Sequence, residues 1–219
     1  VAFAWAYAMA VESASGTQVP PRAAALRGCL LELERIANHL GDLGYLGNDV
    51  SLSFGFFQFW RLKEDLLRVN AAVFGHRYLM DSIVPGGVAR DLTTEDAARL
   101  IAIIDRIESD VRQLRAIYDE HAGVQDRFMT TGEVSAELAT RMGLTGLAAR
   151  ASGIRCDLRI DHPIAPYDTT QVRIATQTAG DVAARVAVRF DEVFESVRVV
   201  RALVARLPRA RFIPIVYHF

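Results

Sequence analysis

The stretch PPRAAALRGCLLELERIANHLGDLGYLGND, residues 20–49, decides the fold of this chain. Two prolines open it, and proline is tolerated in the first turn of a helix. Apolar residues then recur every three or four positions, which is the period of one helix face. These residues are Leu26, Leu30, Leu33, Ala37 and Leu40. The pattern predicts one long helix over residues 20–49 that packs along this stripe.

The opposite face of this predicted helix carries charged and polar side chains. Glu32 and Arg35 are three positions apart, as are His39 and Asp42, so each pair can touch on the helix surface. Asp49 follows a glycine-spaced segment at the end of the stretch. Such a face can line a buried polar site, or it can be the solvated face of an ordinary bundle helix, which is the commoner use of charged residues. The sequence leaves both interpretations open.

Composition excludes several classes of function. The chain has 219 residues, enough for one domain with a sizeable core, and its net charge of −1 gives no basic surface for nucleic acid. Cys29 and Cys156 are isolated, so no C-x-x-C motif for zinc or an iron–sulfur cluster exists. His39, His121 and His162 do not have enough cysteines or carboxylates near them, at a suitable spacing, to complete a metal site. We therefore expect this chain to bind no metal by itself.

The chain is apolar, with 51% hydrophobic residues and a mean hydropathy of +0.16. No uncharged apolar run reaches the roughly 18 residues of a membrane-spanning helix. The excess indicates helices buried on more than one side, or a surface meant for a partner. The chain begins inside the apolar run VAFAWAYAMAV without an initiator methionine. We expect it to be a fragment of a longer protein.

Further helices are predicted downstream. Residues 52–74 have helical spacing, and core packing is favoured for the aromatic residues at their start. Thr93 with Asp96 is a capping signal for a helix that ends near Gly123, and Asp181 begins a last helix before Pro208. The expected fold is mainly α, a single domain over 1–219 built as a bundle of long antiparallel helices, with residues 209–219 unassigned.

Shorter elements are predicted between the long ones. Residues 135–142 read as a short amphipathic helix, residues 85–87 as a turn and residues 171–176 as a brief strand. The segment LTGLAARASGIRCDLRIDHPIAPYD, residues 144–168, breaks the helical period and is rich in glycine, arginine and aspartate. Binding residues concentrate in such structured polar loops.

Several separated blocks, taken together, resemble the large subunits shared by membrane-bound nickel–iron hydrogenases and respiratory complex I. The chain is similar to the quinone-pocket subunit of complex I, and closer still to the hydrogenase-4 and formate hydrogenlyase branch. The resemblance runs from Val1 to about Leu207 and does not include residues 209–219. It implies that the chain is the central part of a longer subunit. The blocks are PPR (20–22), LELERIANHLGDLG (31–44), KEDLLR (63–68), GHRYLM (75–80), VPGGV (84–88), TTGEVS (130–135), GLTG (143–146), DLR (157–159) and YD (167–168).

The resemblance implies a hydrogenase large-subunit-like core that packs against a small iron–sulfur subunit, in the cytoplasm at the inner face of the membrane. In hydrogenase members two C-x-x-C pairs hold nickel and iron, because thiolates suit these metals. In complex I members the vacated cavity receives a quinone head group. This chain has neither cysteine pair, so we expect no cofactor in it, whereas the parent complex would hold quinone or nickel–iron and a partner-held iron–sulfur cluster.

The resemblance also implies site residues. Asp49 matches an aspartate on the wall of the quinone pocket, where it pairs with an upstream histidine and raises that histidine's pKa. Arg77 matches an arginine near the partner's iron–sulfur cluster. The complex I pattern has a histidine two residues after this arginine, where this chain has Leu79; His76 comes before it instead, as in the hydrogenase-4 branch.

In the resemblance, the 144–168 loop forms the partner interface. The interface residues carried over are Arg150, Ser152, Gly153, Asp157 and Arg159. A purely structural alternative is an Asp157–Arg159 network that ties the loop down.

Two functions remain open. The first is part of an oxidoreductase of the hydrogenase-4 or NADH:quinone oxidoreductase type, which passes electrons from the partner's cluster to quinone or protons. Alone it would be inactive, since the cluster, the upstream histidine and the metal cysteines are absent. The second is a non-catalytic helical scaffold subunit that has lost the metal site.

Overall fold

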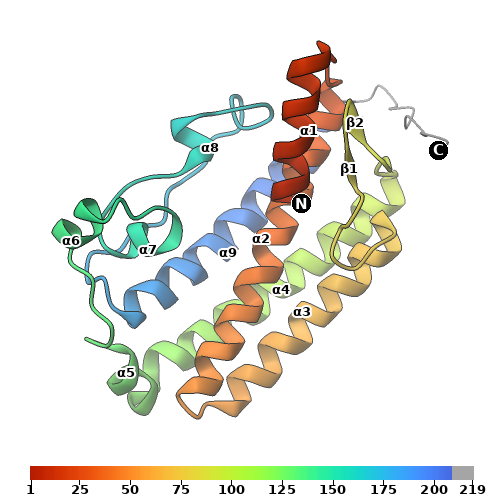
Figure 1. Ribbon diagram of the computed structural model, residues 1–219. Helices are drawn as coiled ribbons and strands as arrows, with labels where there is room; N and C mark the ends of the chain where they lie inside the picture. Colours follow the sequence, from red (N-terminus) through yellow and green to blue (C-terminus); the bar gives the residue numbers. More distant parts are fainter. Residues whose placement is uncertain (209–219) are drawn as a thin grey trace.

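The computed structural model describes residues 1–208, a bundle of long helices with shorter helices on one side (Figure 1). The unassigned tail, residues 209–219, lies outside the described residues. The prediction of a mainly α fold with a small β element is confirmed. The elements are α1 (Ala2–Ser15), α2 (Pro21–Asp49), α3 (Ser53–Phe74), β1 (Ile83–Val84), β2 (Gly87–Val88), α4 (Thr94–Glu120), α5 (Ala122–Phe128), α6 (Ala136–Arg141), α7 (Gly146–Ala151), α8 (Leu158–Asp161) and α9 (Val182–Ala205).

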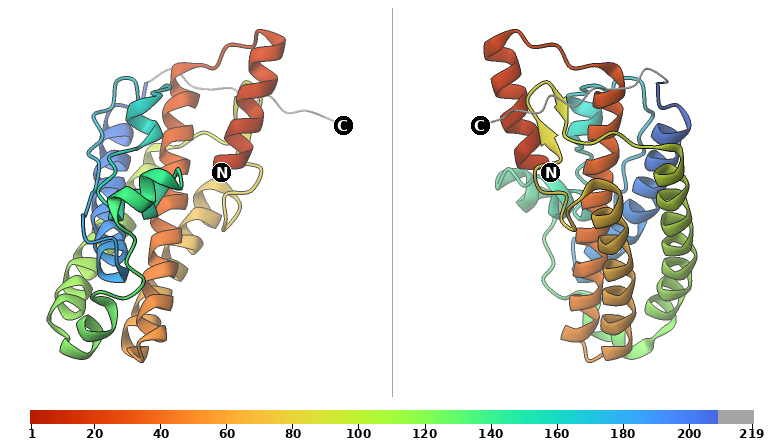
Figure 2. Two further views of the ribbon diagram at one scale, coloured as in Figure 1. Left: turned by 60° about the vertical axis from the view of Figure 1, so that its left-hand side comes forward. Right: turned by 90° about the vertical axis from the view of Figure 1, so that its right-hand side faces the viewer.

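The central helix of the bundle is α2. It packs along both α3 and α9, and α4 contacts α3 and α9, so that four long helices run side by side (Figure 2). The predicted apolar stripe is buried: Leu26, Leu33 and Leu40 have no exposed surface, and Leu30 almost none. Burying each such leucine contributes about 1.5–3 kcal/mol relative to leaving it exposed. This stripe therefore holds the bundle together.

The long helices begin and end close to the predicted residues. Helix α2 begins at Pro21, and Gly75 ends α3 with a φ of +87°, a left-handed conformation that favours glycine. Helix α4 stops before the predicted Gly123. The reason is His121, whose backbone is extended and whose Nδ1 accepts a hydrogen bond from the N–H of Val124 in the first turn of α5.

Two glycines let an aromatic side chain enter the bundle. The hydroxyl oxygen of Tyr118 on α4 occupies the space that a Cβ would need at Gly47 of α2 and at Gly55 of α3. The hydroxyl donates a hydrogen bond to the carbonyl oxygen of Leu43 at 2.9 Å. Because a Cβ at either glycine would overlap this oxygen, α2, α3 and α4 can meet here only without those side chains.

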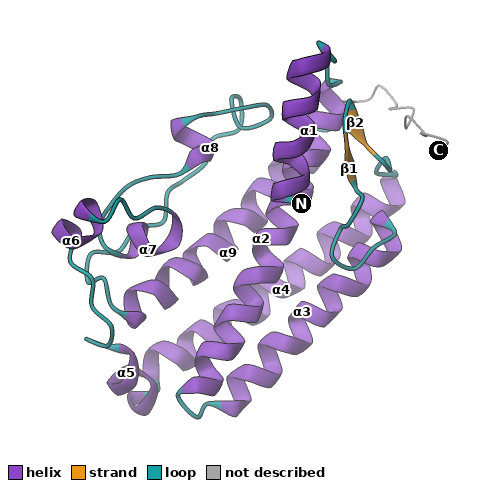
Figure 3. Cartoon of the chain, viewed as in Figure 1, coloured by secondary structure: helices purple, strands orange, loops and turns teal. Residues whose placement is uncertain are grey.

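An arginine of α2 holds the β-hairpin against α1. Arg27 donates to the carbonyl oxygens of Gly87 at 2.9 Å and Val84 at 2.7 Å, and pairs with Glu12 of α1 at 2.5 Å. Glu12 also accepts the N–H of Gly86 at 2.7 Å. Burial raises the pKa of Glu12, but these partners reverse the shift, so it stays ionised. Figure 3 shows the hairpin in orange beside α1.

One sequence prediction fails and another holds only in part. The segment over residues 171–176 joins no sheet within residues 1–208, so the predicted strand is wrong. Of the aromatic residues at the start of α3, Phe59 is fully buried, whereas Phe54 is 49% and Phe57 67% exposed. Core packing therefore explains only part of this cluster, and α1 likewise exposes Phe3 to solvent.

No helix among the described residues is both long and apolar enough to cross a bilayer.

The capping signal at α4 gives a direct prediction. Thr93 accepts the N–H of Asp96 at 3.1 Å and donates its hydroxyl to the Asp96 carboxylate at 2.7 Å. We expect Thr93→Ala to lower the free energy of unfolding by about 1 kcal/mol, because an amide of the first turn loses its partner. Urea unfolding measures this. The neighbouring Thr94→Ala is the control, and equal effects of the two changes would contradict the capping role.

Candidate functional site

A buried carboxylate, Glu32 on α2, is the centre of a polar network. Its side chain has no exposed surface, and Arg159 on α8 donates to both carboxylate oxygens at 3.0 and 3.1 Å. The hydroxyls of Tyr167 and Ser196 each donate to one of these oxygens at 2.6 Å. Arg159 also binds Asp157 at 3.0 and 2.6 Å. These five residues, the Glu32 network, join α2 to α8 and α9.

The Glu32 network holds fixed charges at neutral pH. Burial raises the pKa of Glu32, but Arg159 and Arg35 outweigh it, so the pKa lies below its ordinary value. Burial also raises the pKa of Asp157, and its bonds to Arg159 reverse that shift. Burial and the charge of Glu32 both raise the pKa of Tyr167, so the phenol keeps its proton. At neutral pH the network therefore ties α2 to α8 and α9 through ion pairs and hydrogen bonds.

A second buried group, the Glu192 network, consists of Glu192, His39 and Arg150. His39 Nε2 lies 2.7 Å from Glu192 Oε2, and Arg150 Nη2 lies 2.5 Å from Oε1. Burial raises the pKa of Glu192, but the hydrogen bond from His39 and the nearby Arg150 lower it to about 2. Burial lowers the pKa of His39 despite its carboxylate partner, so the ring is neutral at pH 7 and donates from Nε2.

Arg35 connects the two networks. Its Nε lies 3.5 Å from Glu32 and its Nη1 lies 3.7 Å from Glu192. The predicted Glu32–Arg35 pair is confirmed, but the predicted pair of His39 with Asp42 is wrong, because the histidine turns toward Glu192 on α9. The polar face of α2 is therefore partly a buried site and not only a solvated surface.

Four of the five loop residues predicted for the partner interface are buried. Arg150, Asp157 and Arg159 are buried in the two networks, and Ser152 is fully buried with no partner for its hydroxyl within residues 1–208. Gly153 has a φ of +88°. The ties that the Asp157–Arg159 alternative predicts are therefore present.

The loop also exposes apolar side chains. Leu158 is 75% and Ile160 40% exposed, on either side of the inward-pointing Arg159. Anchoring of Arg159 thus fixes which side chains of α8 face outward.

Arg77 and His76 follow the end of α3 and lie at the surface. Arg77 makes a two-point ion pair with Glu64, at 3.0 and 2.6 Å, which lowers the pKa of Glu64 to about 2. Nδ1 of His76 accepts the N–H groups of Tyr78 at 3.2 Å and Met80 at 3.4 Å. The local backbone thus fixes the histidine ring, and Glu64 on α3 largely balances the charge of Arg77.

Asp49 lies far from these residues. It is the last residue of α2, is exposed and forms no ion pair within residues 1–208. Arg77 follows the opposite end of α3, which has 22 residues and so is about 33 Å long. The described residues therefore form no single pocket that contains both Asp49 and Arg77.

Glu192, the carboxylate of the second network, is not among the residues predicted from the sequence. It lies four residues after Val188 and four before Ser196, and all three are buried. A charged residue on the buried stripe of a helix is the signal that could have found it.

Residues 1–208 do not fit a nickel–iron centre. They contain no group of three metal-binding side chains. Cys29 is fully buried, and burial together with Glu32 raises the pKa of its thiol to about 12, whereas a metal ligand must be a thiolate. The described part of the chain thus supplies no ligand set for those metals.

Comparison with known proteins supports the resemblance. Residues 49–216 match the family model described as respiratory-chain NADH dehydrogenase, 49 Kd subunit. This match covers more than half of the chain. It extends to residue 216, so the expectation that the resemblance ends at about Leu207 is wrong.

Relatives come from both branches. An NADH-quinone oxidoreductase subunit from Thermosipho melanesiensis is 33% identical over 202 residues, 92% of this chain and 55% of that protein. Formate hydrogenlyase subunit 5 of Escherichia coli is 30% identical over 203 residues, 93% of this chain and 36% of that protein. The carbon monoxide-induced hydrogenase of Rhodospirillum rubrum is 32% identical, over 92% of this chain and 56% of that protein.

The chain spans about half the length of these relatives or less. The match to the family model and these identities along nearly the whole chain lead to one conclusion: the chain belongs to the family of the 49 Kd subunit of respiratory-chain NADH dehydrogenase.

Proposed function

We propose that this chain is the helical core of an oxidoreductase subunit that passes electrons from a partner-held iron–sulfur cluster to quinone or protons. The observation that carries the proposal is its similarity, over more than nine-tenths of its length, to named subunits of NADH-quinone oxidoreductase and formate hydrogenlyase. Such a subunit would sit at the inner face of the membrane through its complex.

The geometry of the loop supports a partner-facing role. The two networks anchor Arg150, Asp157 and Arg159 to the bundle, and this anchoring presents Leu158 and Ile160 outward. In this proposal the five loop residues set the shape of the interface, while the exposed apolar side chains contact the small iron–sulfur subunit. Residues held by buried ion pairs would keep that surface rigid before the partner binds.

Asp49 and Arg77 lie toward opposite ends of the bundle, so in this proposal each contributes to a different site. Arg77, with His76 beside it, would lie near the partner's cluster, where positive charge favours the reduced state. Asp49 would pair with a histidine from a part of the protein outside this chain and would line the quinone pocket. The exposure of Asp49 and its lack of an ion pair within residues 1–208 leave it available for this role.

A scaffold role is the second candidate. It is supported by the two buried networks, whose ion pairs tie the loop over residues 144–168 to the bundle. A scaffold would bind the same partner but would transfer no electrons.

Metal content of the full-length protein, purified with its iron–sulfur partner, separates the candidates. About one nickel per complex would assign hydrogen chemistry. Iron without nickel would leave the quinone reductase and the scaffold.

Within that second outcome, a substitution at Asp49 discriminates further. We expect Asp49→Asn to lower quinone reduction by about tenfold or more with unchanged iron content, because loss of a carboxylate lowers the pKa of its histidine. Asp42→Asn, an exposed change on the same helix, is the control. No quinone reduction by the wild-type complex would favour the scaffold.

A further inference from the structure

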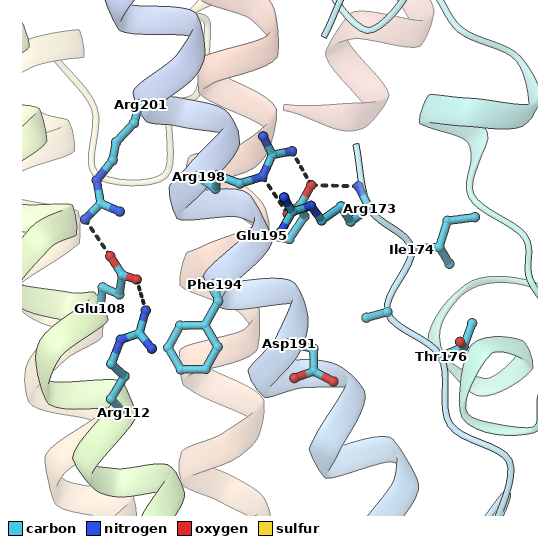
Figure 4. Close-up of a pocket in the computed structure, with 11 residues that line it drawn as sticks. Glu108, Arg112, Arg173, Ile174, Thr176, Asp191, Phe194, Glu195, Arg198 and Arg201 are labelled. Atoms are coloured by element: carbon cyan, nitrogen blue, oxygen red, sulfur yellow. Dashed lines mark hydrogen bonds and ion pairs between the residues drawn. The ribbon is translucent and has the colours of Figure 1, made fainter. Parts of the chain in front are cut away.

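The segment predicted as a strand lines a groove. Residues 173–176 form one wall, α4 forms the other and α9 forms the floor, around a volume of about 530 Å³. Figure 4 shows this arrangement, with the segment running beside α9 and the side chains of α4 on the far side. We call this cavity the strand groove. Its wall is a piece of backbone that has no neighbouring strand within residues 1–208.

The backbone along this wall has unused hydrogen-bonding groups. Within residues 1–208, the amides and carbonyls of residues 174–176 make no hydrogen bond. The segment is nevertheless fixed in place. Glu195 accepts the N–H of Arg173 at 2.7 Å, and the carbonyl of Arg150 accepts the N–H of Gln177 at 2.9 Å. A fixed segment with a free edge is a template for an added strand, which would lie about 4.8 Å away.

The charges of the groove favour an acidic occupant. Its charged lining residues are the arginines Arg112, Arg173, Arg198 and Arg201 and the carboxylates Glu108, Asp191 and Glu195. Each of these carboxylates already has an arginine partner. Arg173, in contrast, forms no ion pair within residues 1–208, and it directly precedes the free edge of residues 174–176. An incoming carboxylate would therefore find a free guanidinium, whereas an incoming cation would find no free carboxylate.

We propose that the strand groove binds an extended acidic peptide segment of a partner protein, which pairs with the backbone of residues 174–176 and places a carboxylate on Arg173. The free edge accounts for the extended conformation of the ligand, and the charge of Arg173 accounts for its acidity. A simple anion would use the arginine but would leave the backbone edge unpaired. This inference does not depend on the electron-transfer role proposed above.

Hydrogen exchange of the full chain tests the proposal. The probe is a short capped peptide of alternating glutamate and valine, and its matched control replaces every glutamate with lysine. Successive N–H groups of an extended segment point to opposite edges, so we expect the acidic peptide to slow exchange of alternate amides within residues 174–176, and the lysine peptide to leave all three unchanged. Arg173→Glu should weaken binding of the acidic peptide about tenfold or more. Arg99→Glu, an exposed change elsewhere on α4, should alter it by less than about twofold.

Three results would overturn the proposal. The first is equal protection by both peptides, which would show that charge plays no part. The second is unchanged exchange at residues 174–176 with millimolar acidic peptide. The third is strong protection of these amides in the free chain, which would mean that another part of the same chain already occupies the groove.

Discussion

Replacing Arg159 with methionine is expected to lower the free energy of unfolding by about 3–5 kcal/mol at pH 7. Arg159 is 6% exposed and neutralises Glu32, which has no exposed surface, together with Asp157. Methionine keeps much of the apolar stem but leaves two carboxylates in the interior without their main counter-charge. Urea unfolding followed by circular dichroism measures the change.

The pH dependence separates lost charge from lost packing. Without Arg159, burial raises the pKa of Glu32 above its unfolded value, so the variant regains stability as pH falls through that raised pKa. We expect the deficit relative to wild type to be smaller at pH 5 than at pH 7. Arg99→Met, which removes an exposed pair with Glu95, should change stability by less than about 0.5 kcal/mol. An Arg159→Met deficit that is equal at both pH values would contradict the electrostatic explanation.

The long helices can be predicted from the sequence because periodicity and capping act over a few residues. The stripe over residues 20–49 gives α2 to within one residue, and Asp181 begins α9 as its N-cap. The strand over residues 171–176 is predicted wrongly because a strand forms only with a partner, which local sequence does not show. Alternation shows only that a segment can pair, whereas pairing requires a second strand, and the fold of residues 1–208 supplies none.

In the candidate site, a contact between residues close in sequence can be predicted, whereas contacts between distant residues cannot. The Glu32–Arg35 pair follows from a spacing of three residues along one helix. Arg159 reaches Glu32 from 127 residues away, and Glu192 reaches His39 from 153 residues away. These contacts depend on how the loop over 144–168 folds back onto the bundle, which no local pattern encodes. The sequence therefore indicates that α2 has a polar face, but not that this face is buried.

Acid is expected to destabilise the folded chain in two steps, and the Glu192 network accounts for both. His39 has a folded pKa below its ordinary value of 6.5, so the unfolded chain binds a proton first and stability declines as pH falls below about 6.5. Glu192 has a folded pKa of about 2 against an ordinary value of 4.5, so its contribution is present above pH 4.5 and is lost as pH falls toward 2. This difference between the folded and the ordinary pKa of Glu192 corresponds to about 3 kcal/mol of folding free energy.

The variant Glu192→Gln tests the lower step. Glutamine cannot titrate, so the decline between pH 4.5 and 3 should become shallower, while stability at pH 7 should drop by about 3–5 kcal/mol because Arg150 keeps its buried charge without a counter-ion. Asp119→Asn, an exposed carboxylate on α4, is the control and should leave the profile unchanged. Urea unfolding at a series of pH values gives both quantities. A Glu192→Gln profile parallel to wild type would move the acid sensitivity to the Glu32 network, whose carboxylates also have lowered pKa values.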